Sequence, residues 1–326
     1  MRKAITTNTM LLPIALVMGS LLWILPEAGN LLLWGGWFVG ILTAYGWFEM
    51  NARLQLLRER SQMVSTTFFL TLTCVPLLHE FSLANLLPPT LLLAYANLFT
   101  SYQERHPESR LFHAFLLLGL ASLVVPQVIW LLPLLLFCCS LHLRSLTPRS
   151  LGAACIGLLL PIVGVALWSV ATWDFTLLSE GVTEFWHSAT HIDMAYWETV
   201  YIATPLTLPP EEWQFLVSAT CVMLLSIIAI THQAQTSYLD KIRVRMFLYV
   251  MDFTQGGLLL LLLLFPEWRW TWLLLLIANG APLIAHYFTL TRGWVATTIF
   301  WFSILCLILL LIFNFQTAWI VSLIFS

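Results

Sequence analysis

Long apolar runs alternate with short polar stretches along almost the whole chain. A helix crosses the hydrocarbon core of a bilayer with about 20 apolar residues, and most of these runs approach that length. The pattern therefore predicts an all-α fold, a polytopic transmembrane helical bundle that forms one domain over residues 1–326. The eleven predicted spans cover residues 8–25, 31–48, 63–79, 81–100, 111–125, 127–140, 151–170, 213–231, 246–265, 272–290 and 294–313.

The fifth and sixth predicted spans are short and meet at Pro126. They form either two tilted spans or one re-entrant hairpin, so the bundle has eleven spans or nine plus the hairpin. Both alternatives return the chain to the same side of the membrane. The topology predicted for the rest of the chain is therefore the same in both cases.

Basic residues are distributed unevenly between the two sets of connections. Cytoplasmic loops are enriched in Lys and Arg, whereas acids contribute little to orientation. With the N-terminus inside, every basic residue except Arg269 falls on the inner side. The prediction is N-inside and C-outside, with residues 313–326 as a short tail that is interfacial or partly inserted. The inner basic residues are Arg2, Lys3, Arg53, Arg58, Arg60, Arg105, Arg110, Arg144, Arg149, Lys241, Arg243, Arg245 and Arg292.

Composition agrees with insertion in a membrane. Apolar residues make up 60% of the chain and charged residues 9%, whereas a soluble domain carries about 25% charged residues. The net charge of −2 gives no reason to expect nucleic acid as a partner. The six cysteines lack metal-ligand spacing, so we expect them to pack between helices and expect no cofactor. The expected location is the bacterial inner (cytoplasmic) membrane, with membrane lipids and other membrane-protein subunits as partners.

The longest polar stretch, residues 171–212, contains acids and aromatics but no Lys or Arg. Within it, residues 176–191 place Phe185 and Trp186 on one face of a helix and polar side chains on the other. This pattern is typical of an amphipathic helix that lies on a membrane surface. We therefore expect an interfacial helix on the outer face.

Glu184, His187 and His191 share the polar face of that helix. One hypothesis is a metal-binding or acid/base site, because spacings of three and four residues align side chains and imidazole with carboxylate suits Zn²⁺. The other hypothesis is a solvated polar face. We favour the second, because the segment contains no H-E-x-x-H motif and no third strong ligand pattern.

Asp252 is the one carboxylate predicted inside a span, and Gln255 lies three residues after it. An intramembrane acid is costly, so it indicates a functional site by default. The alternative, which we favour, is an interfacial or packed acid, because Arg245 lies on the same helix face and span ends are predicted only to a few residues. Three histidines near span ends are expected to be hydrogen-bonded packing residues rather than proton relays: His113, His142 and His286.

The order of elements between residues 63 and 170 resembles a known pattern. It combines a short outer turn, a basic inner loop at 101–110, the apolar run 112–123 and Pro126. This order resembles the central helices of polyprenyl-phosphate-sugar-dependent glycosyltransferases of the GT-C class. The whole chain is similar to an uncharacterised family of multi-pass inner-membrane proteins from Bacteroidota.

The resemblance to the glycosyltransferases implies a GT-C-like helical architecture. Those enzymes carry a catalytic acid in a long first outer loop. Here that loop consists of residues 26–30, with Glu27 as its only acid. The resemblance therefore implies a similar helical architecture for this chain but assigns a catalytic role to none of its residues.

Three functions are compatible with the sequence. The favoured one is a non-catalytic membrane subunit or scaffold of an envelope complex, because no chemical motifs converge and the loops are short. The second is an envelope enzyme that acts on a lipid-linked sugar precursor at the outer face through residues 171–212. The third is a transporter that uses Asp252.

Overall fold

All regular structure in the described part of the chain is helical, which confirms the predicted all-α class. The computed structural model describes residues 6, 8–59, 61–174, 176–192, 194, 209–291 and 293–325, with backbone only at 177, 178, 210, 296 and 316–325. Its α-helices are α2 (Leu11–Ile24), α3 (Leu31–Leu54), α4 (Met63–Thr73), α5 (Leu87–Thr100), α6 (Glu108–Val124), α7 (Leu131–Leu141), α8 (Pro148–Thr172), α9 (Thr176–Thr190), α11 (Pro210–Thr236), α12 (Ile242–Leu264), α13 (Arg269–Leu290) and α14 (Trp294–Phe325).

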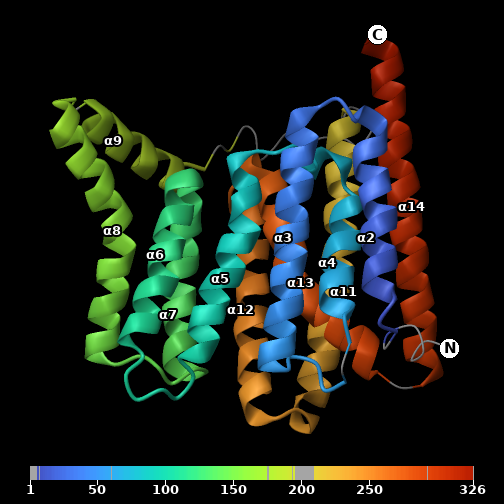
Figure 1. Ribbon diagram of the computed structural model, residues 1–326, viewed down its shortest axis with the longest axis horizontal. Helices are drawn as coiled ribbons and strands as arrows, with labels where there is room; N and C mark the ends of the chain where they lie inside the picture. Colours follow the sequence, from blue (N-terminus) through green and yellow to red (C-terminus); the bar gives the residue numbers. More distant parts are fainter. Residues whose placement is uncertain are drawn as a thin grey trace.

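The helices α2 to α8 and α11 to α14 run side by side in alternating directions, and α9 lies across one end of the bundle (Figure 1). The connections α3–α4, α5–α6, α7–α8 and α11–α12 gather at the opposite end. Two contacts between these connections confirm their proximity: Gln103 N donates to Leu143 O at 3.2 Å, and Lys241 Nζ donates to Gln55 Oε1 at 3.2 Å. These connections and the helix ends beside them carry all of the described basic residues except Arg269, and we call their end of the bundle the basic end.

Seven helical segments are long and apolar enough to cross a membrane. They are Leu31–Leu54, Leu83–Thr100, Pro148–Thr172, Glu211–Leu239, Ile242–Leu264, Pro266–Leu290 and Thr297–Phe315. This finding agrees with the predicted transmembrane helical class. The helices α2, α4, α6 and α7 have only 11 to 17 residues, so the count of eleven spans stays a prediction.

The predicted span 63–79 is wrong in its second half. The helix α4 ends at Thr73, and Val75 adopts φ −123° and ψ 84° before a 3₁₀ turn over Pro76–Leu78. Proline has no N–H to continue the helix, and the residue before it is pushed out of the helical region. The next span also begins later than residue 81, because a 3₁₀ turn over Leu83–Leu86 precedes α5.

The last helix continues through the residues predicted as a tail, whereas its apolar span Thr297–Phe315 lies close to the predicted 294–313. The helix α14 runs without interruption from Trp294 to Phe325. The polar residue Asn314 does not end it, because Asn314 Nδ2 donates to Cys74 O at 2.7 Å and to Ser218 Oγ at 3.2 Å. Similarly, α11 extends five residues beyond the predicted end at 231.

The chain reverses at Pro126 through the 3₁₀ turn Pro126–Trp130, which joins α6 to α7. Both helices run along the bundle beside their neighbours (Figure 1). Whether they cross the bilayer twice or form a re-entrant hairpin stays a prediction.

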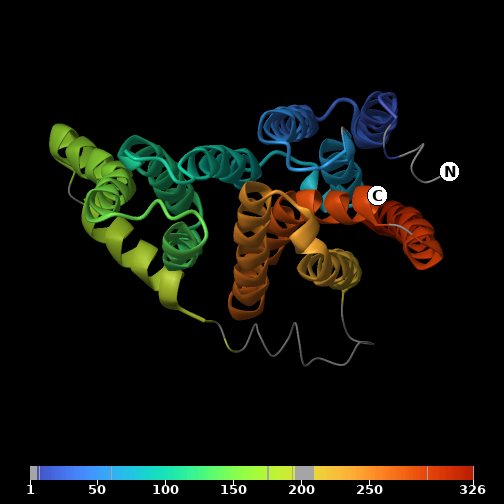
Figure 2. The same ribbon diagram turned by 90° about the horizontal axis from the view of Figure 1, so that it is seen from below.

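The helix α13 is the centre of the larger group of helices. It contacts α4, α5, α11 and α12, and almost all of its residues are buried. Seen from below, α6 to α9 form a second group beside it, joined through α5 and α7 (Figure 2). Within this second group, α6 packs on α8 along most of its length.

Two glycines allow the backbones of α6 and α8 to touch. A Cβ added at Gly157 would lie 2.4 Å from Phe112 O, and one at Gly119 would lie 2.8 Å from Leu158 O. Small residues at such positions are typical of close helix packing in membranes.

Replacing Gly157 by Ala should lower the free energy of unfolding by about 1–3 kcal/mol, because α6 and α8 must separate to admit the methyl group. The matched control is Gly164→Ala on the same helix, where nothing lies within 4 Å of the added Cβ. That change should be neutral or stabilise by up to about 1 kcal/mol through helix propensity. Equilibrium unfolding in mixed micelles measures both effects. Equal effects of the two changes would contradict the packing argument.

Candidate functional site

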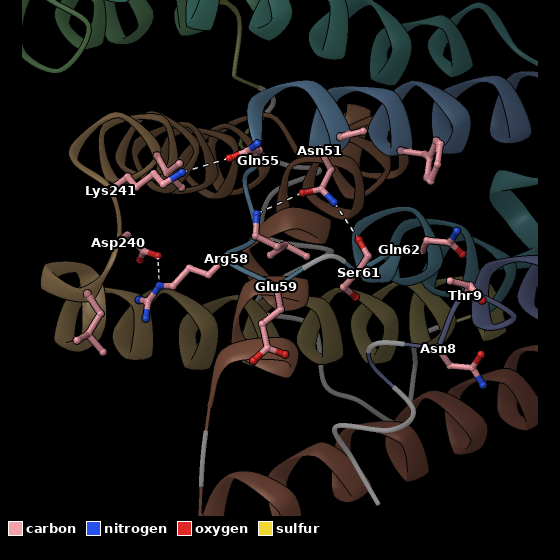
Figure 3. A pocket seen from close by; sticks show the side chains of 15 residues that line it. Asn8, Thr9, Asn51, Gln55, Arg58, Glu59, Ser61, Gln62, Asp240 and Lys241 are labelled. Atoms are coloured by element: carbon pink, nitrogen blue, oxygen red, sulfur yellow. Dashed lines mark hydrogen bonds and ion pairs between the residues drawn. The ribbon is translucent and has the colours of Figure 1, made fainter.

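A polar pocket of about 1180 Å³ opens at the basic end of the bundle (Figure 3). Its walls are the end of α3, the α3–α4 connection, the α11–α12 turn and the chain just before α2. The lining residues that carry polar side chains are Asn8, Thr9, Asn51, Gln55, Arg58, Glu59, Ser61, Gln62, Asp240 and Lys241.

The α3–α4 connection is held in shape by Asn51. Its Nδ2 donates to Ser61 O at 2.9 Å, and its Oδ1 accepts from Leu57 N at 3.3 Å. Gln55, with φ 52° and ψ 49°, ends α3 in the left-handed region and turns the chain into this connection. One amide therefore fixes both ends of the pocket wall, which indicates a preformed pocket.

A cluster of Arg58, Asp240 and His286 lies beside this wall; Asp240 and His286 are buried, whereas Arg58 is partly exposed, and Arg58 and Asp240 line the pocket. Arg58 Nε donates to Asp240 Oδ1, and Arg58 Nη2 donates to Thr236 O at 3.3 Å. His286 Nε2 lies 3.2 Å from Asp240 Oδ2. Because a carboxylate only accepts, that ring nitrogen carries the proton and donates it. The cluster thus ties the α3–α4 connection, the α11–α12 turn and α13 together.

Asp240 is ionised in this cluster. Burial raises the pKa of the carboxyl, but the hydrogen bonds from His286 and Arg58 outweigh burial and lower the pKa from 3.8 to about 2. The Asp240 side chain is 1% exposed, whereas that of Arg58 is 30% exposed and faces the pocket. No local pattern in the sequence indicates the cluster, because its members lie on three separate segments.

The pocket lining contains many hydrogen-bonding groups and little net charge. Arg58 and Lys241 are balanced by Asp240 and Glu59, and Lys241 donates to Gln55 Oε1. The remaining polar lining consists of amides and hydroxyls, which both donate and accept. This arrangement suits a ligand with mixed donors and acceptors, such as a polypeptide segment, better than a strongly charged ion.

The helix α9 occupies the stretch for which the amphipathic pattern predicts a helix. It is held at its end by the turn before α7: Gln127 Nε2 donates to Ser188 O and Trp130 Nε1 to Ala189 O, both at 2.8 Å. Phe185 is half-buried, whereas Trp186 is 66% exposed. A position on the membrane surface stays a prediction for this helix.

Glu184 and His187 are exposed on α9, and His191 is exposed directly after its end. The rings of His187 and His191 stack with centroids 4.6 Å apart. Within the described residues, no group of three or more His, Cys, Asp and Glu side chains is placed to hold a metal ion. The outer residues Asp193 and Glu198 lie outside the described part of the chain.

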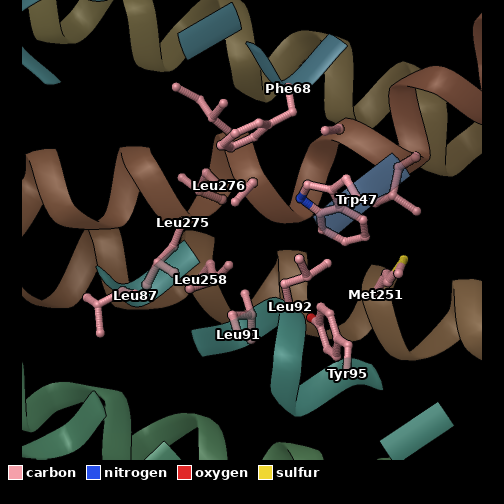
Figure 4. Packing of buried hydrophobic residues seen from close by; sticks show 14 of the residues in the cluster. Trp47, Phe68, Leu87, Leu91, Leu92, Tyr95, Met251, Leu258, Leu275 and Leu276 are labelled. Atoms are coloured by element: carbon pink, nitrogen blue, oxygen red, sulfur yellow. The ribbon is translucent and has the colours of Figure 1, made fainter. Parts of the chain in front are cut away.

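Gln255 belongs to a buried polar network in the middle of the bundle. Its Oε1 accepts from Asn279 Nδ2 at 2.7 Å, and its Nε2 donates to Ser226 Oγ at 3.0 Å. Tyr95 OH completes the network by donating to Asn279 Oδ1 at 2.5 Å. The tyrosine ring lies among Leu91, Leu92 and Met251 (Figure 4), so the network crosses an otherwise apolar core.

The three histidines singled out from the sequence have different surroundings. His286 is fully buried on Asp240, His142 is buried against the rings of Tyr249 and Phe253, and His113 is exposed on α6. His113 Nδ1 lies 2.6 Å from the carbonyl oxygen of Ser109. The basic residue predicted to stand alone outside, Arg269, in fact pairs with Glu212 at 2.5 Å, because the first turns of α11 and α13 meet there.

No family model, no curated protein and no solved structure matches this chain. The resemblance to GT-C glycosyltransferases and to the Bacteroidota family therefore stays a prediction.

Proposed function

We propose that this integral membrane protein is a non-catalytic subunit or scaffold of an envelope complex, and that the pocket at the basic end receives a polar segment of a partner subunit. Seven helices long and apolar enough to span a membrane support the membrane location. The positive-inside rule supports placing the basic end in the cytoplasm and the chain in a bacterial inner membrane.

The observation that carries the proposal is the construction of the pocket. Connections form it together with the ends of α3 and α12, and hydrogen bonds of Asn51 and the ion pair of Arg58 with Asp240 tie those connections to the helices. A preformed site binds with less loss of conformational entropy than a flexible loop. Its amide lining supplies the hydrogen bonds that the backbone of a bound polypeptide needs.

A photo-crosslinking amino acid placed at Gln55 tests the proposal in the native membrane. Gln55 lines the pocket and ends α3 with φ 52°. The matched control is Gln103, which lies in the α5–α6 connection at the same end of the bundle with φ 55° but does not line the pocket. We expect a discrete protein adduct from Gln55 and none from Gln103.

A pocket-filling variant makes the result specific. Ala52 is exposed and lines the pocket, so Ala52→Trp fills space without disturbing the core. We expect this variant to lose the Gln55 adduct and the co-purifying partner while keeping its melting temperature. Adducts with lipid alone, or equal protein adducts at both glutamines, would overturn the proposal.

A further inference from the structure

A line of polar side chains enters the membrane-spanning part of the bundle between α11 and α12. Both helices pack on α13, and polar side chains of α11 and of the 3₁₀ turn Ser237–Leu239 after it meet those of α12 at three places, which we call levels. From the basic end inwards, the levels pair Ser237 with Tyr249, Gln233 with Asp252, and Ser226 with Gln255. The first and third levels are hydrogen bonds, at 3.1 Å and 3.0 Å.

The second level differs from the other two, because buried polar atoms of Gln233 and Asp252 lack hydrogen-bond partners among the described residues. Gln233 is 1% exposed and its amide neighbours the Asp252 carboxyl. Yet Asp252 Oδ1 and both polar atoms of Gln233 are buried without a well-formed hydrogen bond to any described residue. A buried amide with no such bond is rare and costly.

We propose that Asp252 is a proton-binding site within the membrane and that Gln233 positions it. The carboxylate takes one proton from the aqueous phase at the basic end and becomes a neutral acid. Its O–H then donates to Gln233 Oε1, while Gln233 Nε2 donates to the other carboxyl oxygen. This exchange satisfies the polar atoms of both side chains without placing a charge in the bilayer. The site is separate from the pocket and does not depend on the function proposed for it.

The charged and titratable groups around Asp252 do not supply a counter-charge in contact with it. Arg245 lies seven residues earlier on α12, about 10 Å along the axis, and its Nε is buried without a partner. Burial lowers the pKa of His142, which keeps that imidazole neutral at neutral pH. On α11, His232 packs against the Tyr287 ring of α13, and Tyr249 OH donates to Ser237.

A lipid-soluble carbodiimide tests the site, because it modifies carboxyl groups that are protonated inside a membrane. The full-length protein in vesicles is treated over a range of pH, and modified peptides are identified by mass spectrometry. We expect Asp252 to be modified at neutral pH, with a rate that falls about tenfold per pH unit above its midpoint. Asp240, which is ionised and paired, should stay unmodified at neutral pH.

A matched pair of substitutions gives a second measurement. Asp252→Asn replaces a neutral acid by a neutral amide, so the melting temperature at neutral pH should not change. Asp240→Asn makes the same replacement at an ionised acid and should lower it. The proposal is overturned if Asp252 stays unmodified, if Asp252→Asn lowers the melting temperature as much as Asp240→Asn, or if sodium chloride protects Asp252 where choline chloride does not.

Discussion

Replacing Arg58 by Met should lower the free energy of unfolding by about 1.5–3 kcal/mol, because the buried Asp240 carboxylate loses one charge-assisted hydrogen bond and keeps only the one from His286. Asp240 has a side chain only 1% exposed, and Arg58 is its basic partner outside α13. Methionine keeps most of the side-chain volume, so the change removes charge and hydrogen bonds more than packing. Equilibrium unfolding in mixed micelles measures the effect.

The matched control is Arg53→Met on α3. Arg53 pairs with Glu49 one turn away, but its side chain is 75% exposed. An exposed pair of this kind contributes about 0.3–0.5 kcal/mol, so the control should change little. Adding Asp240→Asn to Arg58→Met removes the buried charge that lost its arginine partner and should restore part of the stability. If both arginine changes cost the same, the buried pair is not what holds the α3–α4 connection.

The pH dependence of the wild-type protein follows from the same pair. The pKa of Asp240 is lowered from 3.8 to about 2 in the folded protein. A lowered pKa contributes stability above the unfolded value, and that contribution is lost as the pH falls through the folded value. The wild type should therefore lose on the order of 2 kcal/mol between about pH 4 and pH 2 through this residue. The Asp240→Asn variant should lack that loss.

The helices were predictable because the length of an apolar run is a local property of the sequence. Boundaries failed where tertiary contacts decide them. Asn314 continues α14 because Cys74 O and Ser218 Oγ accept its hydrogen bonds, and neither partner is near it in the chain. Pro76 could have signalled the end of α4, because proline interrupts a helix by its own chemistry.

The candidate site could not be predicted for a related reason. Arg58 and Asp240 are 182 residues apart, and Asp240 and His286 are 46 apart. Each stands in an ordinary polar connection or near a span end, so none carries a motif. In contrast, Asp252 and Gln255 were recognisable, because a polar side chain inside an apolar run is conspicuous without any knowledge of its neighbours.

Replacing Asn279 by Leu should lower the free energy of unfolding by about 2–4 kcal/mol, because two buried side-chain groups then lose their partner at about 1–3 kcal/mol each, and Met251 O loses the hydrogen bond from Asn279 Nδ2. Asn279 is fully buried, accepts from Tyr95 OH and donates to Gln255 Oε1. The expected total is smaller than the sum of the upper limits for the individual groups, because polar groups of an unfolded chain in a membrane also find hydrogen-bond partners.

The control for this change is Asn97→Leu on α5. Asn97 donates only within its own helix, to Leu93 O at 2.9 Å, so its loss should cost less than about 0.5 kcal/mol. Adding Tyr95→Phe to Asn279→Leu removes one orphaned hydroxyl and should recover about 1 kcal/mol or more. Such a recovery would show that the cost of Asn279→Leu comes from unsatisfied hydrogen bonds. No recovery would instead assign it to the poor fit of leucine between α5, α12 and α13.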